Sequence, residues 1–274
     1  MPPSRLRPRR RAIVPTPHVL YEQTGAIAVL TFNRPEARNA MTWEMYQALV
    51  DFCDRAESDT AVRVLVLRGA GGKAFVAGTD IAGFRGFASP ADGIAYEQRL
   101  DAVIDRLERV AVATIAQIDG VVAGGGAAIA AACDLRICTP AARFGVPIAR
   151  TLGNCLSAAN HARFLDLIGP TRLKEMLYTG RLLGPQEALE AGLVNRLVKS
   201  EELADAVLEM AATIAANAPL TIRATKEMIR RVQVQRRPAP GTGHDLIGAC
   251  YGSADFREGV DAFLAKRAPH WRGV

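Results

Sequence analysis

The sequence predicts an α/β fold in which buried strands alternate with helices and a helical region follows. Short apolar, β-branched runs separated by amphipathic stretches fill the first part of the chain, and such alternation favours parallel strand pairing. After Ser157 the periodicity is almost purely helical. With 274 residues, 49% of them hydrophobic and 23% charged, the chain can bury a sizeable core.

The individual elements follow in chain order. Predicted strands are the short apolar runs 18–23, 26–32, 62–68, 112–118, 135–139 and 193–198. Predicted helices are the stretches with helical periodicity at 42–58, 90–110, 157–168, 171–179, 185–191, 201–216, 219–233 and 254–267. Thr24-Gly25 indicates a hairpin between the first two strands, and Thr42 can cap the first helix. The Pro- and Gly-rich stretch 236–243 predicts a loop before the last helix.

Charge and composition divide the chain into three expected regions. Residues 1–17 hold five arginines and no acidic residue, so the rest of the chain carries only +1 of the net charge of +6. A basic, proline-rich composition predicts a disordered tail, and the tail lacks the apolar stretch of a secretory signal. We expect a core over 18–198 and a helical region over 199–274.

The five cysteines are odd in number and include no C-x-x-C pair. This pattern suggests neither a disulfide framework nor a metal site, and buried free thiols are typical of a reducing compartment. We therefore expect a cytoplasmic protein without a metal. No apolar run reaches the roughly 18 residues that a membrane span needs, so no membrane partner is expected.

Two glycine-rich segments carry the chemical signal. Phe75–Ile81 (FVAGTDI) and Asp119–Ala128 (DGVVAGGGAA) each read as a buried strand, a glycine turn and a helix start. Unpaired N–H groups point outward from helix starts. Two such donors that converge form an oxyanion hole, which stabilises negative charge on a carbonyl oxygen. The alternative is that Gly124–Gly126 only allow helices to pack closely.

Six motifs in register resemble those of the crotonase (enoyl-CoA hydratase/isomerase) superfamily over about residues 18–272. They are NRPEARNA at 33–40, AGTDI at 77–81, GGG at 124–126, TG at 179–180, ALEAGLV at 188–194 and FLAKRAP at 263–269. The resemblance implies a crotonase-type spiral of strand–strand–helix turns with a C-terminal helical trimerisation region. It further implies a homotrimer or hexamer and an acyl-CoA substrate, with coenzyme A present as part of the substrate and no separate cofactor.

The resemblance also implies roles for particular residues. The oxyanion donors would be the backbone N–H groups of Thr79 and Gly125. Contacts with the coenzyme or the acyl group would come from Ala37, Arg38, Ala77, Asp80, Ile81, Ala82, Gly124, Ile148 and Lys266. Lys266 would reach the coenzyme phosphates from a neighbouring subunit. The alternatives are that Lys266 lies on a solvated helix face and that Asp80 only caps its turn.

Two positions depart from the family pattern. The glutamates that a hydratase of this family uses would stand at Ala128 and Ile148, and both residues are aliphatic. General acid–base catalysis typically contributes about 10²–10⁴-fold to the rate for each group. Classical hydration is therefore not expected from these two positions, because a polarised thioester would lack proton transfer.

A different polar group in the following loop could take over. Asn154, Cys155 and Ser157, with His161 beyond them, are the candidates to face the acyl chain. Cys155 could act as a nucleophile if a base lowered the pKa of its thiol, and the alternative is an inert buried thiol. Ser157 could instead be a helix N-cap, and His161 an ordinary helix residue.

Three functional hypotheses remain open at this stage. The first is an acyl-CoA enzyme that uses the oxyanion hole for isomerisation, decarboxylation or thioester hydrolysis. The second is a non-catalytic acyl-CoA-binding protein. The third is an RNA-associated relative that binds through the Arg-rich tail and four further arginines, Arg230, Arg231, Arg236 and Arg237.

Overall fold

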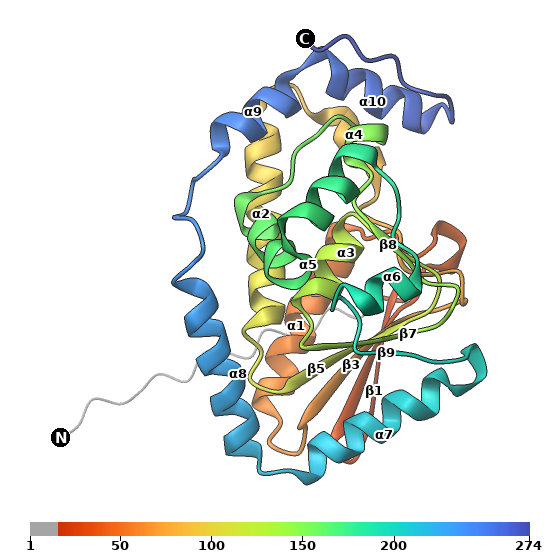
Figure 1. Cartoon of the computed structure of the whole chain (residues 1–274), viewed down its shortest axis with the longest axis vertical. Coiled ribbons are helices and arrows are strands. Elements are labelled where there is room, and N and C mark those ends of the chain that lie inside the picture. Colours follow the sequence, from red (N-terminus) through yellow and green to blue (C-terminus); the bar gives the residue numbers. More distant parts are fainter. Residues whose placement is uncertain (1–15) are drawn as a thin grey trace, which may run out of the picture.

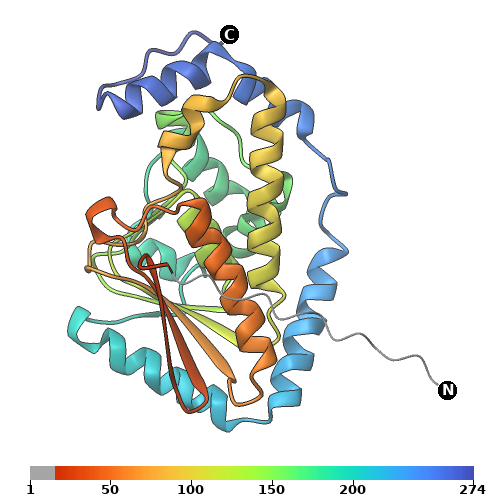
Figure 2. The ribbon, with the colours of Figure 1, turned by 180° about the vertical axis from the view of Figure 1, so that it is seen from behind.

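Two sheets surrounded by helices form the body of the molecule, which Figures 1 and 2 show from opposite sides. The structure is a computed structural model that describes residues 16–274. The larger sheet has the order β1-β2-β3-β5-β7-β9 and the smaller sheet the order β4-β6-β8. The predicted tail, residues 1–17, lies outside the described residues except for Thr16 and Pro17.

The strands are short, and all pairs within the two sheets are parallel except β1 with β2. Their bounds are β1 Val19–Thr24, β2 Ile27–Phe32, β3 Val64–Gly69, β4 Ala74–Val76, β5 Ala113–Ile118, β6 Val121–Ala123, β7 Leu135–Cys138, β8 Arg143–Gly145 and β9 Arg196–Leu197. The predicted hairpin is confirmed, with Gly25 in its turn at φ 58°. The predicted strand 193–198 is reduced to the two residues of β9.

The helices cover both faces of the larger sheet and extend beyond it. Their bounds are α1 Trp43–Ser58, α2 Pro90–Glu108, α3 Gly125–Ala132, α4 Ile148–Thr151, α5 Ala158–Thr179, α6 Pro185–Glu190, α7 Leu203–Ala216, α8 Pro219–Val234, α9 His244–Gly252 and α10 Ala254–Leu264, with short 3₁₀ turns η1 Pro35–Ala37, η2 Ile81–Gly86 and η3 Ser200–Glu202. Thr42 caps α1 by accepting a hydrogen bond from the N–H of Met45. The two helices predicted between 157 and 179 are one element, α5, broken at Gly169 (φ 67°).

Alternate residues of the central strand β3 face two separate cores. Leu65 and Leu67 belong to the larger core, which α1, α2 and α3 help to form. Val64 and Val66 belong to a smaller core that α7 covers through Leu203 and Val207. Because successive side chains of a strand point to opposite faces, a sheet buried on both sides needs a continuous apolar run, as the sequence of β3 provides.

The C-terminal helices return to the end of the molecule where α2 and α4 begin. Figures 1 and 2 show α8, a linker and then α9 and α10 running along one side of the fold and across its end. Helix α9, which the sequence analysis did not predict, packs against α2, and α10 packs against η2 and α4. The final helix ends at Leu264, earlier than predicted, and Lys266 follows at φ 54°.

Within residues 16–274, no helix is by itself both long and apolar enough to cross a membrane. The pair 200–216 and 219–234 meets the length and composition criteria only jointly, and the two helices bend by 104° at their junction.

Candidate active site

Two glycine turns lie side by side where neighbouring strands of the smaller sheet end. Gly78 (φ 126°) follows β4, and Gly124 (φ 52°) follows β6, which pairs with β4 in parallel. A Cβ atom on Gly124 would lie only 3.6 Å from the Cα atom of Gly78. Positive φ angles favour glycine, so the two turns reach this conformation because of the sequence AG at 77–78 and GGG at 124–126.

The residues after these glycines carry the two expected donors, the N–H groups of Thr79 and Gly125. In the described part of the chain, neither N–H donates to a protein acceptor. Gly125 is the first residue of α3, and the first N–H groups of a helix have no partner within it. A Cβ atom at Gly125 would lie 2.3 Å from Tyr46 Oη, so only glycine fits there without rearrangement.

Gly126 has a different role from its two neighbours. A Cβ atom at this position would lie 2.1 Å from the carbonyl oxygen of Val76, because α3 packs directly on β4. The triplet therefore combines both readings of the sequence. Gly124 and Gly125 shape the turn, and Gly126 allows close packing.

A cavity of about 110 Å³ opens beside the two turns. Its wall includes seven of the residues singled out from the sequence, namely Ala77, Thr79, Ile81, Gly124, Gly125, Ile148 and Asn154. Apolar side chains of α2, α4, the following loop and α10 complete it, among them Leu100, Leu152, Leu156 and Phe263. The structure thus brings two free backbone donors beside a small, mostly apolar cavity.

The remaining substrate-binding candidates lie outside this wall. The loop of Ala37 and Arg38 is adjacent to it, since the N–H of Ala77 donates to the carbonyl of Arg38 over 3.1 Å. Asp80 caps η2 through the N–H of Ala82 and pairs with Arg34 at 2.7 Å. These contacts agree with the structural alternative for Asp80. Lys266 is exposed beyond the end of α10.

Cys155 and Ser157, two of the three polar loop residues considered catalytic, do not line the cavity. Burial raises the pKa of the Cys155 thiol to about 12, which opposes formation of a thiolate nucleophile. Ser157 is the N-cap of α5, and its hydroxyl accepts from the N–H of Asn160 and donates to Asp101. His161 contacts the Ser157 carbonyl through Nδ1, as an ordinary helix residue does. Of the three polar candidates in the loop, only Asn154 therefore lines the wall.

The two positions where the family pattern places glutamates are located differently. Ile148 lines the cavity, whereas Ala128 is 2% exposed and belongs to the larger core. Neither residue carries a proton-transferring group.

An acidic residue of helix α2 also lines the cavity. Glu97 lines the wall and is only 2% exposed. Its Oε1 accepts a hydrogen bond from Tyr251 Oη (2.7 Å), and its Oε2 accepts one from the N–H of Ser157 (3.0 Å). Burial, together with the nearby charge of Asp101, raises the pKa of Glu97 to about 7, despite these two donors that favour the carboxylate.

The sequence analysis missed Glu97, although a signal was present. The buried face of α2 includes Gly93, Leu100, Ile104 and Leu107, and Glu97 falls in register with them. A carboxylate on an apolar helix face is uncommon unless it is paired or functional. The hydrogen-bond partners of Glu97 could not be inferred, because Tyr251 belongs to the helix that was not predicted.

Hydroxyl groups and an amide complete the polar part of the site. Thr79 Oγ1 lies 2.8 Å from both Tyr46 Oη and Tyr96 Oη, and burial raises the pKa of both phenols. These groups stay neutral and hold the Thr79 side chain in place. Asn154 Nδ2 donates to Tyr251 Oη over 2.9 Å, and Asn154 Oδ1 is buried without a protein partner among the described residues. That oxygen can accept a hydrogen bond from a ligand.

The fold and the glycine turns agree with comparisons to known proteins. Residues 22–274 match the family model described as Enoyl-CoA hydratase/isomerase, and the chain belongs to that family. It is 33% identical over 251 residues to the short-chain-enoyl-CoA hydratase of Clostridium acetobutylicum, covering 91% of this chain and 95% of that protein. It is also 33% identical over 253 residues to the crotonyl-CoA hydratase of Syntrophomonas wolfei, covering 91% and 96%.

Solved structures of relatives share the whole architecture. An enoyl-CoA hydratase/carnithine racemase from Magnetospirillum magneticum superposes with a TM-score of 0.76 at 32% identity, covering 95% of this chain and 97% of that one. A methylmalonyl-CoA decarboxylase in complex with 2-nitronate-propionyl-CoA has a TM-score of 0.85 at 27% identity, covering 94% and 99%. The expected α/β crotonase-type fold is thereby confirmed.

Proposed function

We propose that this protein is an acyl-CoA enzyme that shifts a carbon–carbon double bond next to the thioester. In this proposal the N–H groups of Thr79 and Gly125 bind the thioester oxygen, and Glu97 moves the proton. One observation carries it. Glu97 lines the same cavity of about 110 Å³ as Thr79 and Gly125, the residues of the two unpaired backbone donors.

Each group matches one requirement of the reaction. Removing a proton from the carbon next to a thioester creates an enolate, and two preorganised N–H donors stabilise its oxygen. A general base is most effective when its pKa is near the working pH, and Glu97, with a pKa of about 7, meets that condition. These features support a base and an oxyanion site that need no contribution from positions 128 and 148.

A single carboxyl group is sufficient for isomerisation. Glu97 takes the α-proton of a β,γ-unsaturated acyl-CoA, the electron pair shifts to form the α,β double bond, and the γ-carbon takes the proton back. The substrate and product are isomers, so no water or leaving group is needed. Hydration, in contrast, needs water to be activated as well, and Ile148 in the wall cannot do this.

Decarboxylation and hydrolysis are supported less well. Among residues 16–274, no Lys, Arg or His lines the cavity to hold a second carboxylate of a substrate. Hydrolysis through Cys155 would need a thiolate, and burial of that thiol opposes it. The apolar wall of Ile148, Leu152 and Leu156 instead suits a short, uncharged acyl chain.

The coenzyme portion and the assembly are part of the same proposal. The segment of Ala37 and Arg38 lies next to the first glycine turn, and Asp80–Ala82 begins η2, so both can border the coenzyme. Lys266 is exposed and free to meet phosphates. We further propose a homotrimer or hexamer, which light scattering with size-exclusion chromatography tests directly.

Binding without turnover remains the second candidate, and RNA binding is supported less. Arg230 and Arg231 pair with Glu227, Arg236 with Asp166, and Arg237 with Glu108. The arginine group of the RNA hypothesis is therefore largely neutralised by the protein itself.

The test compares 3-hexenoyl-CoA and crotonyl-CoA as substrates, with products measured by mass spectrometry and binding by calorimetry. We expect conjugated 2-hexenoyl-CoA from the first substrate and slow or no hydration of the second. Glu97→Gln should abolish isomerisation and keep ligand binding, and Glu201→Gln, an exposed carboxyl, is the matched control. Binding of both ligands without any product would favour the non-catalytic alternative.

A further inference from the structure

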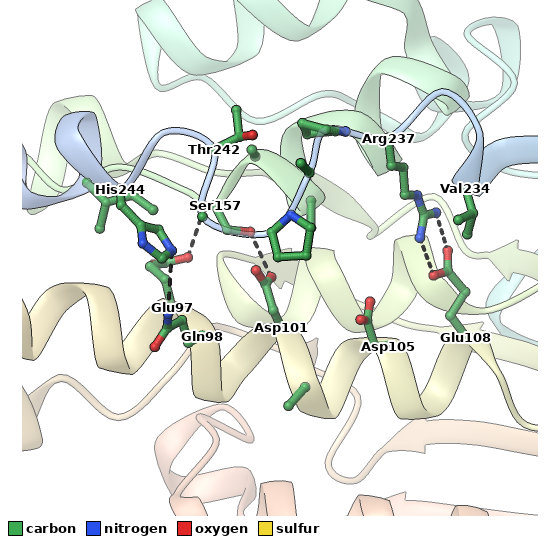
Figure 3. Close-up of a pocket in the computed structure, with 18 of the residues that line it drawn as sticks. Glu97, Gln98, Asp101, Asp105, Glu108, Ser157, Val234, Arg237, Thr242 and His244 are labelled. Carbon is green, nitrogen blue, oxygen red and sulfur yellow. Dashed lines mark hydrogen bonds and ion pairs between the residues drawn. The ribbon is translucent and has the colours of Figure 1, made fainter.

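A second, larger cavity is also lined by Glu97. It measures about 590 Å³ and is enclosed by α2, the start of α5 and the linker between α8 and α9. Figure 3 shows Glu97, Asp101, Asp105 and Glu108 along α2, facing the linker that carries Thr242. Glu97 lines both this cavity and the candidate active site. It is the only carboxylate among residues 16–274 that lines both spaces.

Ser157 contacts both Glu97 and Asp101, two residues in the wall of the larger cavity. The N–H of Ser157 donates to Glu97 Oε2 (3.0 Å), and Ser157 Oγ donates to Asp101 Oδ1 (2.7 Å). Figure 3 draws both bonds. Asn160 Nδ2 also donates to Asp101 Oδ1 (3.1 Å), so the half-buried Asp101 side chain is held in one orientation at the cavity wall.

The proposed reaction gives this arrangement a role. An acyl group in the smaller cavity leaves little room for water, since one water occupies about 30 Å³ of liquid. Glu97 is only 2% exposed. The two residues that donate hydrogen bonds to its carboxyl group, Tyr251 and Ser157, are also buried, so neither connects it to solvent by another route. The larger cavity, in contrast, is lined by four carboxylates, two hydroxyl residues, three arginines and His244. Polar, roomy sites of this kind hold water.

We propose that Glu97 exchanges its proton with solvent through the larger cavity while substrate fills the smaller one, and that Asp101 is the positioning residue for this exchange. The inference rests on the proposed function, because it concerns the proton that Glu97 removes from the acyl group. Asp101 holds Ser157 beside Glu97 and orders water at the cavity wall. The proton then has two fates: return to the substrate or loss to solvent.

The ratio between these two fates can be measured. Isomerisation of 3-hexenoyl-CoA in D₂O gives product with deuterium only when Glu97 exchanges before it returns the proton. We expect substantial deuterium per product for the wild type. Asp101→Asn, which keeps an oxygen acceptor for Ser157, should lower deuterium per product about fivefold or more, while total isomerisation changes less. A merely structural defect would lower the rate and leave that ratio unchanged.

Two further variants distinguish the effect of the cavity's open space from the effect of the Asp101 charge. Ala102→Phe adds apolar bulk inside the larger cavity and should lower deuterium per product as Asp101→Asn does. Thr242→Val, which changes the opposite wall and removes no side-chain hydrogen bond within residues 16–274, is the matched control and should behave like the wild type.

The outcomes distinguish this inference from the proposed function. Isomerisation without any solvent deuterium in the product, or unchanged deuterium in Asp101→Asn, would overturn the exchange route and leave the isomerase proposal intact. If the protein does not isomerise the substrate, proton exchange at Glu97 is instead measured by infrared spectroscopy, with butyryl-CoA bound in the smaller cavity. The Glu97 carboxyl band is identified as the one that is absent in Glu97→Gln. After transfer of the wild type to D₂O, exchange of the carboxyl proton should shift this band within the mixing time. The shift should be slower in Asp101→Asn. Equal rates in both proteins would refute the route.

Discussion

Tyr251 Oη donates a hydrogen bond to Glu97 Oε1 across 2.7 Å, although 154 positions separate the two residues in the chain. The contact depends on Gly93, where a Cβ atom would lie 2.2 Å from Tyr251 Cγ. Helix α9 can approach α2 only because this position has no side chain. A glycine one turn before Glu97 thus allows the phenol to reach the carboxyl group.

Removing the Tyr251 hydroxyl should raise the pKa of Glu97 further, because the hydrogen bond favours the carboxylate. In Tyr251→Phe we expect the rising limb of kcat/KM to move to higher pH. Unfolding in urea should be about 1 kcal/mol easier, the usual contribution of such a bond. If the rising limb of kcat/KM stays at the same pH as in the wild type, the Tyr251 hydroxyl does not affect the pKa of Glu97.

The wild-type pH profile should itself have its rising limb near pH 7, because Glu97 must be ionised to act as a base. The groups facing Glu97 are Tyr96 and Asp101 from α2, Tyr251 from α9 and the N–H of Ser157. Isomerisation rates at subsaturating 3-hexenoyl-CoA between pH 5 and 9 would measure the limb. A plateau down to about pH 5 would contradict a raised pKa.

Stability should depend on the same proton. The pKa of Glu97 is raised in the folded state from 4.5 to about 7, so the folded protein binds the proton more tightly. The stabilising contribution is complete below about pH 4.5 and is lost as pH rises through 7, on the order of 3 kcal/mol in total. Urea unfolding of the wild type and Glu97→Gln across this range gives the difference. Parallel curves for both proteins would refute the assignment.

Substitution of Gly125 should disable the proposed oxyanion site. In Gly125→Ala the new methyl group would lie 2.3 Å from Tyr46 Oη, which must move with the bound Thr79 hydroxyl. We expect at least a 100-fold loss of isomerisation, the typical effect of losing one oxyanion donor, and about 1–3 kcal/mol of lost stability from overpacking.

The matched control for that variant is Gly125→Ala combined with Tyr46→Phe. Without the Tyr46 hydroxyl, the ring atom nearest to the new Cβ atom of residue 125 is Cζ, at a distance of 3.6 Å. Thermal unfolding should recover part of the lost stability in the double variant. No recovery would mean that the clash with Tyr46 is not the cause.

The missing glutamates can be tested one position at a time. Ile148 lines the cavity, so Ile148→Glu should bind ligand and gain crotonyl-CoA hydration, with Ile148→Gln as the uncharged control. Ala128 lies in the core, so Ala128→Glu should mainly destabilise the fold, by several kcal/mol. If Ile148→Glu binds crotonyl-CoA and hydrates none of it, the absent acid at this position is not what limits hydration.

Local signals were sufficient for most of the fold. The hairpin at Gly25, the cap at Thr42 and the start of α2 at Pro90 depend on residues close in sequence, and all three are confirmed. Helix α9 was missed because its sequence, HDLIGACYG, contains two glycines and has weak intrinsic helicity. Its stability comes from packing on α2, which no local pattern encodes.

The sequence by itself determined the family and the two glycine turns, because positive φ angles and close approach restrict residue identity at single sites. Only the tertiary structure decided which acidic residue lines the cavity. Glu97 acquires its character from burial, from Tyr251 and from Asp101, and desolvation and charge act through space between elements far apart in the chain. The tertiary structure likewise decided that Asn154 lines the cavity and that Cys155 and Ser157 do not, because this depends on how the loop packs against distant elements.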